Sequence, residues 1–269
     1  AVPLMVAQII NVLYSIVDRI YIGHMEGVGK LALTGVGVAF PVITVITAFT
    51  NMCGMGGAPL FSMERGKGNE ERARSIMGNA CTMLLILAAL LTVLALAFKR
   101  PVLYLFGASD ATYPYAEAYM TIYLLGTVFV QLALGLNMFI TAQGKARTAM
   151  LSVLIGAVTN IVLDPIFIFV FDMGVAGAAW ATITSQALSA AWVLRFLTSQ
   201  KTALRIARRY LKPDFRLIGS FLALGISPFI MQATESAINI VLNHGLQAYG
   251  GDLYVGSMTI LQSVMQLIV

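Results

Sequence analysis

The sequence predicts an all-α fold: a polytopic helical membrane protein with a six-helix N-terminal lobe and the start of a second, repeat-related lobe. Hydrophobic residues make up 59% of the 269 positions and charged residues only 11%, with a mean hydropathy of +0.85. So few polar side chains cannot solvate the surface of a water-soluble domain of this size. Long apolar runs and an uneven placement of Lys and Arg point to the same class.

Eight apolar runs are long enough, at about 20 residues, to cross the hydrocarbon layer of a bilayer or to begin a crossing. They lie at residues 3–22, 31–62, 76–98, 114–142, 148–171, 178–197, 221–246 and 254–269. The second and fourth runs exceed the thickness of the bilayer, so tilt or shifted boundaries must absorb the excess. The lipid bilayer is therefore an expected partner.

The basic residues predict the orientation. Of the 17 Lys and Arg residues, 13 fall in the connections after the second, fourth and sixth runs, and the other side holds Arg19, Lys30, Lys99 and Arg100. The positive-inside rule makes the basic connections cytoplasmic and places the N-terminus inside, as expected for a multi-pass protein of the plasma (inner) membrane. The net charge of +5 then reflects topology, and no nucleic-acid partner is expected.

Three segments are expected along the chain. Residues 1–197 would form the six-helix lobe, residues 198–220 an amphipathic cytoplasmic connector that acts as a hinge, and residues 221–269 the start of the second lobe. An ordinary basic loop is the alternative for the connector. The spacing from Pro3 to Asp18 recurs between Pro228 and Asn243, which suggests a parallel repeat of the kind found in alternating-access transporters. The second lobe would be incomplete, as in an N-terminal fragment of a longer protein.

A single carboxylate interrupts the apolar run TNIVLDPIFIFVF at residues 159–171. A charge at mid-bilayer depth costs roughly 2.5–3.5 kcal/mol, so the Asp164 carboxylate is expected to face a cavity or a partner. Asn160 lies four residues earlier on the same helical face. Pro165 lacks an amide hydrogen, and its ring clashes with the carbonyl of Ile161, which predicts a bend beside the acid. The alternative is an Asp with a purely structural role inside the bundle.

Further polar groups are expected at the same level as Asp164, in the outer half of the membrane. Asp18 comes late in a helix that runs outward, as Asp164 does. Tyr119 and Thr182 come early in helices that run inward, and a rise of about 1.5 Å per residue brings them to a similar depth. Glu235 lies near the middle of the seventh run and would supply an acid from the second lobe.

Two neighbouring carboxylates in a low-dielectric cavity favour protonation of one of them. Such a pair can hold a proton near physiological pH, or bind a small cation through its oxygens. Asp18, Asn160 and Asp164 are then the expected ligands if the ion is sodium, and no cofactor besides a proton or sodium is predicted. Arg19 points about 100° away from Asp18 around the helix, so it is expected to extend outward to the membrane surface. A salt bridge to another helix is the alternative.

Five motifs, in order, resemble the multidrug and toxic compound extrusion (MATE) transporters of bacterial or archaeal type. They are YSIVDRIYIGH (14–24), GMGGAPLFSMERGKGNEERAR (54–74), ALGLNMFITAQGKARTAM (133–150), NIVLDPIFIFVFDMGVAGAAWATITSQ (160–186) and GISPFIMQATESAINIVLNHGLQAYGG (225–251). The resemblance implies twelve helices in two lobes, of which this chain would supply the first lobe, helix 7 and part of helix 8.

The resemblance also implies a function. Members of this family are secondary antiporters that export organic cations and amphipathic drugs in exchange for protons or sodium, and a full-length monomer is expected to suffice. Carried over by motif, Asp18, Tyr119, Asn160, Asp164 and Thr182 would form the ion or proton site, with Pro165 as the bend beside it. Glu235 would match the acid of helix 7.

Two other classes remain open at this stage. A flippase for lipid-linked precursors shares the architecture and would require a more cationic central cavity. An intramembrane enzyme would need paired Asp motifs such as GxGD, which Gly250, Gly251 and Asp252 do not form, or clustered Asp residues for magnesium. The sequence has no GxxxxGK[ST] run for ATP. The prediction is a transporter and not an enzyme.

Overall fold

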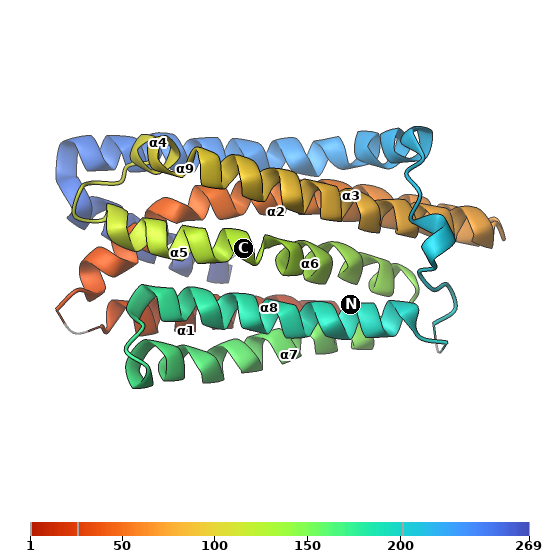
Figure 1. The fold of residues 1–269 in the computed structure, drawn as a ribbon, viewed down its shortest axis with the longest axis horizontal. Coiled ribbons are helices and arrows are strands. Elements are labelled where there is room, and N and C mark those ends of the chain that lie inside the picture. Colours follow the sequence, from red (N-terminus) through yellow and green to blue (C-terminus); the bar gives the residue numbers. More distant parts are fainter. Residues whose placement is uncertain (1, 26, 201, 269) are drawn as a thin grey trace.

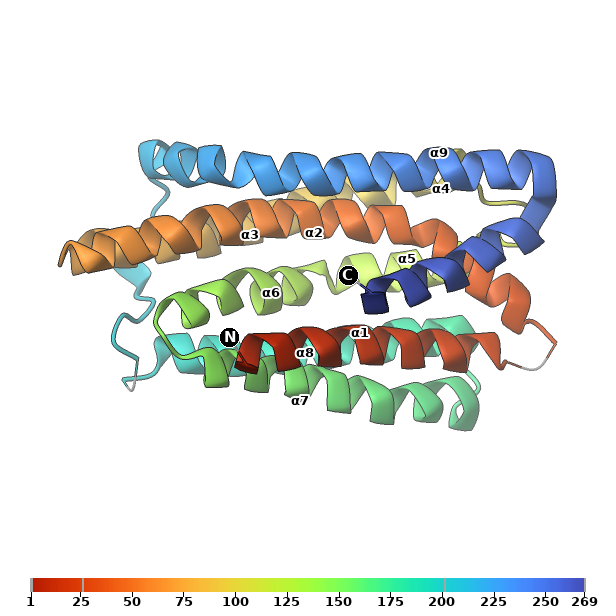
Figure 2. The same ribbon diagram turned by 180° about the vertical axis from the view of Figure 1, so that it is seen from behind.

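The computed structural model describes residues 2–25, 27–200 and 202–268. Lys201 of the basic connector and both terminal residues lie outside this part. Every long element in it is a helix, so the predicted all-α fold class is confirmed. Figures 1 and 2 show an elongated bundle whose long helices run roughly along one axis, with α1, α7 and α8 at one side and α9 at the other.

The helices follow the predicted apolar runs with three differences. The bounds are α1 (Val2–Gly23), α2 (Gly29–Gly66), α3 (Glu70–Ala97), α4 (Lys99–Leu105), α5 (Tyr113–Leu125), α6 (Thr127–Ala142), α7 (Ala146–Pro165), η1 (Ile166–Val170), α8 (Gly174–Thr198), η2 (Arg208–Tyr210) and α9 (Phe215–Ile268). The fourth run is broken into α5 and α6, the short helix α4 was not predicted, and the seventh and eighth runs both lie in α9.

Fewer helices qualify as membrane spans than the eight runs predicted. In the described part of the chain, five helical segments are long and apolar enough to cross a membrane, or six if the bent pair of α5 and α6 is one span. Helix α8, the predicted sixth span, is not among them. It is rich in Ala, Ser, Thr and Gly and packs against α6 and α7, so close contact with neighbouring helices replaces bulk hydrophobicity.

Two glycines explain the breaks that the apolar pattern did not reveal. Helices α5 and α6 are bent by 58° at Gly126, where a Cβ would lie 2.2 Å from the Cγ2 of Ile183. The Thr92 hydroxyl donates to the Leu124 carbonyl at 2.9 Å beside this break. Gly251 has a positive φ of 64° and divides α9 into two helical segments at a kink.

The loosening expected at Pro165 takes the form of a π-helical turn. Helix α7 ends at Pro165, and η1 continues it with wider hydrogen bonding, as in the bond from the Phe171 amide to the Ile166 carbonyl at 2.9 Å. A Cβ at Gly177 of α8 would lie 2.7 Å from the Phe167 carbonyl, so the widened turn is held tightly against α8. Irregular turns of this type often mark functional sites.

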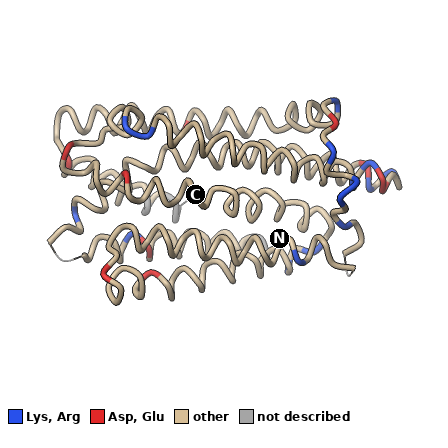
Figure 3. Tube along the Cα trace, viewed as in Figure 1, with Lys and Arg blue, Asp and Glu red and all other residues tan. Residues whose placement is uncertain are grey.

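Charge and apolar packing are separated along the bundle. Figure 3 shows most Lys and Arg residues at one end, where the connections after α2, α6 and α8 lie. One apolar cluster, including Phe61, Ile76 and Leu197, lies toward this basic end, and another, including Ile22 and Leu103, toward the opposite end. The side chains of Val93, Val158 and Val162 are exposed on the outside, as expected for a lipid-facing surface.

The described residues of the connector between α8 and α9 are docked on the first bundle and include the short helix η2. The Gln143 amide donates to the Leu204 carbonyl at 3.1 Å, and the Thr82 hydroxyl donates to the Leu211 carbonyl at 2.8 Å. The side-chain oxygen Oδ1 of Asn79 accepts a hydrogen bond from the backbone amide of Asp214 at 2.7 Å. Leu204 is buried, while Arg205 and most other charged side chains of the connector are exposed. Helix α9 begins at Phe215, six positions before the predicted start.

Removing the Asn79 side chain is expected to release this connector. Asn79→Ala removes the acceptor of the Asp214 amide, and the loss of such a hydrogen bond typically costs about 0.5–1.5 kcal/mol. We expect faster trypsin cleavage at the exposed Arg205 and Arg208 and a lower melting temperature in detergent. Ser62→Ala, which changes an exposed side chain near the same end, is the control. Equal cleavage of both variants would contradict the anchoring role of Asn79.

Candidate functional site

Two carboxyl groups meet in the middle of the bundle. Asp18 of α1 is 8% exposed and Asp164 of α7 is fully buried, and their side chains lie close enough to interact electrostatically. Two carboxyl groups this close can share one proton, because a protonated carboxyl group can donate to an ionised one, which only accepts. The two acids that were predicted to converge thus lie together.

Several oxygens of this cluster lack a protein partner. The Asn160 amide nitrogen donates to Asp164 Oδ1 at 3.2 Å, as the four-residue spacing predicted. Asn160 Oδ1, Asp164 Oδ2 and Asp18 Oδ1 are buried without a hydrogen-bond partner among the described residues. Buried polar atoms are nearly always paired, so three unpaired oxygens in one cluster need an explanation. Oxygens of this type are suitable ligands for a small hard cation or acceptors for a proton donor.

Two tyrosines surround the carboxyl pair. Tyr119 of α5 is buried beside Thr182 of α8, whose hydroxyl donates to the Ala178 carbonyl at 3.0 Å. Tyr14 of α1 lies beside Gln186 of α8 and within electrostatic range of Asp18. The four side chains predicted to share one level thus lie together.

Arg19 does not extend to the membrane surface as predicted. Its side chain is 8% exposed and lines the same cavity as Asp18. The guanidinium group lies 4.6 Å from the centre of the Phe40 ring in α2, and Nη1 donates to the Thr259 carbonyl of α9 at 3.2 Å. The side of α1 that carries Arg19 is covered by α2 and α9. The guanidinium group therefore contacts an aromatic ring and a backbone carbonyl instead of lipid headgroups.

A cavity of about 490 Å³ opens beside the carboxyl pair. Asp18, Arg19, Tyr119 and Thr182 line it from the first bundle, and Glu235 lines it from α9. Glu235 itself is exposed. Asp164 and Asn160 are not among the lining residues, so they contact the cavity only through Asp18 and its neighbours. The cavity thus combines two acids with one guanidinium group.

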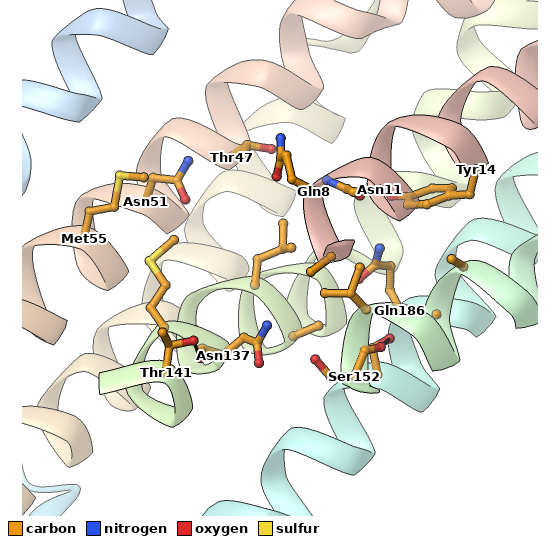
Figure 4. A pocket seen from close by; sticks show the side chains of 18 of the residues that line it. Gln8, Asn11, Tyr14, Thr47, Asn51, Met55, Asn137, Thr141, Ser152 and Gln186 are labelled. Carbon is orange, nitrogen blue, oxygen red and sulfur yellow. Dashed lines mark hydrogen bonds between the residues drawn. The ribbon is translucent and has the colours of Figure 1, made fainter. Parts of the chain in front are cut away.

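A second cavity of about 540 Å³ adjoins the first toward the basic end of the bundle. Figure 4 shows polar side chains from α1, α2, α6, α7 and α8 around it. They are Gln8, Asn11 and Tyr14 of α1, Thr47 and Asn51 of α2, Asn137 and Thr141 of α6, Ser152 of α7 and Gln186 of α8. Gln8, Asn11, Tyr14, Thr47 and Gln186 also line the first cavity. The two cavities therefore share a wall of polar side chains.

The sequence analysis placed Arg19 outside this cavity, and it missed Tyr14 and this group of amides. A signal for the amides was present, because Gln8, Asn11, Ser15 and Asp18 are spaced three or four residues apart and so form a polar stripe on one face of α1. No such signal existed for Arg19, whose partners lie far away in the chain.

A multi-pass helical bundle with two buried carboxyl groups beside a cavity is the arrangement expected in a membrane transporter. The MatE family model matches residues 3–166, more than half of the chain, so the chain belongs to the MATE family of transporters, as its motifs predicted.

Known proteins agree with this assignment. The chain is 27% identical over 250 residues to the multidrug export protein MepA of Staphylococcus haemolyticus. The aligned region covers 93% of this chain and 55% of MepA. It is similar to the solved MATE multidrug transporter DinF-BH, determined with a bound compound, with 32% identity, a TM-score of 0.93 and coverage of 99% of this chain and 59% of that one. An inward-facing MATE family transporter gives a TM-score of 0.89 at 27% identity. The chain spans about half the length of the curated relatives it matches.

Proposed function

We propose that the full-length protein is a secondary antiporter that exports organic cations and amphipathic drugs in exchange for protons or sodium by alternating access. The observation that carries this proposal is the pair of buried carboxyl groups, Asp18 and Asp164, beside a cavity that Asp18 lines. An exchanger needs a site that binds an ion and a substrate at different times. A carboxyl pair that gains or loses one positive charge next to the substrate space meets this need.

Asp18, Asn160 and Asp164 would hold the coupling ion through their unpaired oxygens, and Tyr119 and Thr182 would position them. Glu235 would add negative charge on the side of α9. The π-helical turn after Pro165 would let the end of α7 adjust when the ion binds or leaves. The named function of MepA, multidrug export, supports a drug as the second substrate.

We propose the same orientation and organisation that the sequence suggested. The basic end of the bundle would face the cytoplasm of a plasma (inner) membrane, with the N-terminus inside. Residues 1–197 would form the first lobe, the docked connector would move with it, and α9 would begin a second lobe. A monomer would suffice for transport, and we propose no catalytic activity.

A flippase for lipid-linked precursors is the alternative. One solved relative at 26% identity, a transporter of the same superfamily from Pyrococcus furiosus, is described as having a binding pocket of reverse polarity that suggests a different function. The cavity here has two acids, Asp18 and Glu235, against the single guanidinium of Arg19 in its described lining. This balance favours a cationic substrate over an anionic lipid phosphate.

Transport driven by a single imposed gradient tests the proposal. The full-length protein in vesicles should move a fluorescent organic cation when a proton gradient or a sodium gradient is imposed, each with the other ion balanced. The gradient that drives movement names the coupling ion. If the protein binds the fluorescent cation but neither gradient drives its movement, the antiport proposal would be contradicted.

A further inference from the structure

Arg19 is a charged side chain that lines the cavity. The proposed exchange of an ion for a drug does not by itself need a positive charge there. Its guanidinium group is held by the Phe40 ring at 4.6 Å and by the Thr259 carbonyl at 3.2 Å. Arg19 and Phe40 line the same cavity as Asp18 and Glu235. A buried guanidinium is costly unless it interacts with negative or polarisable groups, so its presence calls for a function.

The charges around the carboxyl pair suggest that function. The pair carries one negative charge when Asp18 and Asp164 share one proton, and the Arg19 guanidinium interacts electrostatically with Asp18. The other charged or titratable groups around this space are Tyr14 of α1, Tyr119 and Tyr123 of α5, and Glu235 of α9. Arg19 thus supplies the positive charge next to the pair, and a cationic substrate would have to approach the same negative potential.

We propose that Arg19 is a specificity-determining residue: a tethered internal cation that competes with cationic substrates for the carboxyl pair. The inference rests on the proposed export of cations. In the absence of substrate, Arg19 balances the pair and lowers the attraction for adventitious cations. A cationic substrate has to displace Arg19 from its interaction with the pair. Only a cation that gains enough binding free energy from the rest of the cavity would therefore bind.

The position of Arg19 also links this competition to the arrangement of the helices. Phe40 belongs to α2, whereas the Thr259 carbonyl belongs to the second segment of α9, 240 positions along the chain from Arg19. A movement of α9 relative to α1 would break the contact with this carbonyl and change the distance between the Arg19 guanidinium and Asp18. The strength of the competition would then differ between the arrangements of the two lobes.

Equilibrium binding of a charged and a neutral ligand separates this role from general packing. The probe is a fluorescent quaternary ammonium dye, whose charge does not depend on pH, and its comparison is an uncharged analogue of the same size. In the purified full-length protein, Arg19→Gln should lower the Kd for the cationic dye roughly tenfold, because one repelling charge is removed. The Kd for the neutral analogue should stay within about twofold of wild type. Arg19→Lys retains the charge and should bind both ligands as wild type does.

Two further variants keep the test decisive. Arg19→Met, of similar length but apolar, replaces Arg19→Gln if the latter does not fold, and should tighten cation binding in the same way. Arg100→Gln removes an exposed charge at the end of the bundle away from the basic loops and should change neither Kd. Unchanged cation binding in a folded, charge-free Arg19 variant would overturn the inference and leave the antiporter proposal intact. A wild-type protein that binds no cation would overturn both.

Discussion

Replacing Asp164 with asparagine is expected to abolish ion-coupled export by the full-length protein. The substitution keeps the size of the side chain and its hydrogen bond to Asn160, but it removes the negative charge and the site of proton uptake. Asp18 would then face an amide that cannot exchange a proton or balance a cation. Export of a fluorescent organic cation from vesicles under the effective gradient should fall to the level of empty vesicles.

The fold should survive this change, because an amide in an apolar interior avoids the desolvation cost of a charge. The melting temperature of Asp164→Asn in detergent should therefore equal or exceed that of wild type. Asp172→Asn is the matched control, since Asp172 is an exposed acid just beyond η1 and its positive φ of 52° is well tolerated by Asn. Export at the wild-type rate by Asp164→Asn would remove the carboxyl pair from the mechanism.

The carboxyl pair could be predicted from the sequence because charge is so unfavourable in an apolar run. Asp18 and Asp164 stand out against their neighbours, and the positive-inside rule together with the helical rise was enough to bring them to one level. The four-residue spacing gave the contact between Asn160 and Asp164 directly. These inferences needed only local geometry and the order of the helices.

Features that depend on contacts between distant segments could not be predicted. The break at Gly126 lies in a continuous apolar run, and a glycine in a helix costs only about 1 kcal/mol, so the pattern gives no reason to expect a 58° bend. The bend follows from the approach of Ile183 in α8. The position of Arg19 was predicted wrongly for the same reason. Its partners lie in α2 and α9, and the sequence does not indicate which helices pack against that side of α1.

Gly225→Ala is expected to push α9 away from α2 and so to destabilise the fold. A Cβ at Gly225 would lie 1.9 Å from the Met52 carbonyl oxygen, and Gly56 in α2 faces the same contact, where its own Cβ would lie 2.0 Å from the Phe221 carbonyl oxygen. Backbone atoms cannot move aside as the end of a flexible side chain can. Overpacking of this kind typically costs 1–3 kcal/mol, which corresponds to a drop in melting temperature of about 2–10 °C.

The same helix provides a control in which only the contact differs. Gly219 lies six residues earlier in α9, and no atom would come within 4 Å of a Cβ there, so Gly219→Ala should leave the melting temperature unchanged or raise it through better helix propensity. An unchanged melting temperature for Gly225→Ala would mean that α2 and α9 separate at little cost. A lower one would identify the contact between Gly56 and Gly225 as a fixed point of the fold. Movement of α9 during transport would then have to pivot there, with larger displacements at Thr259 and therefore at the carbonyl that holds Arg19.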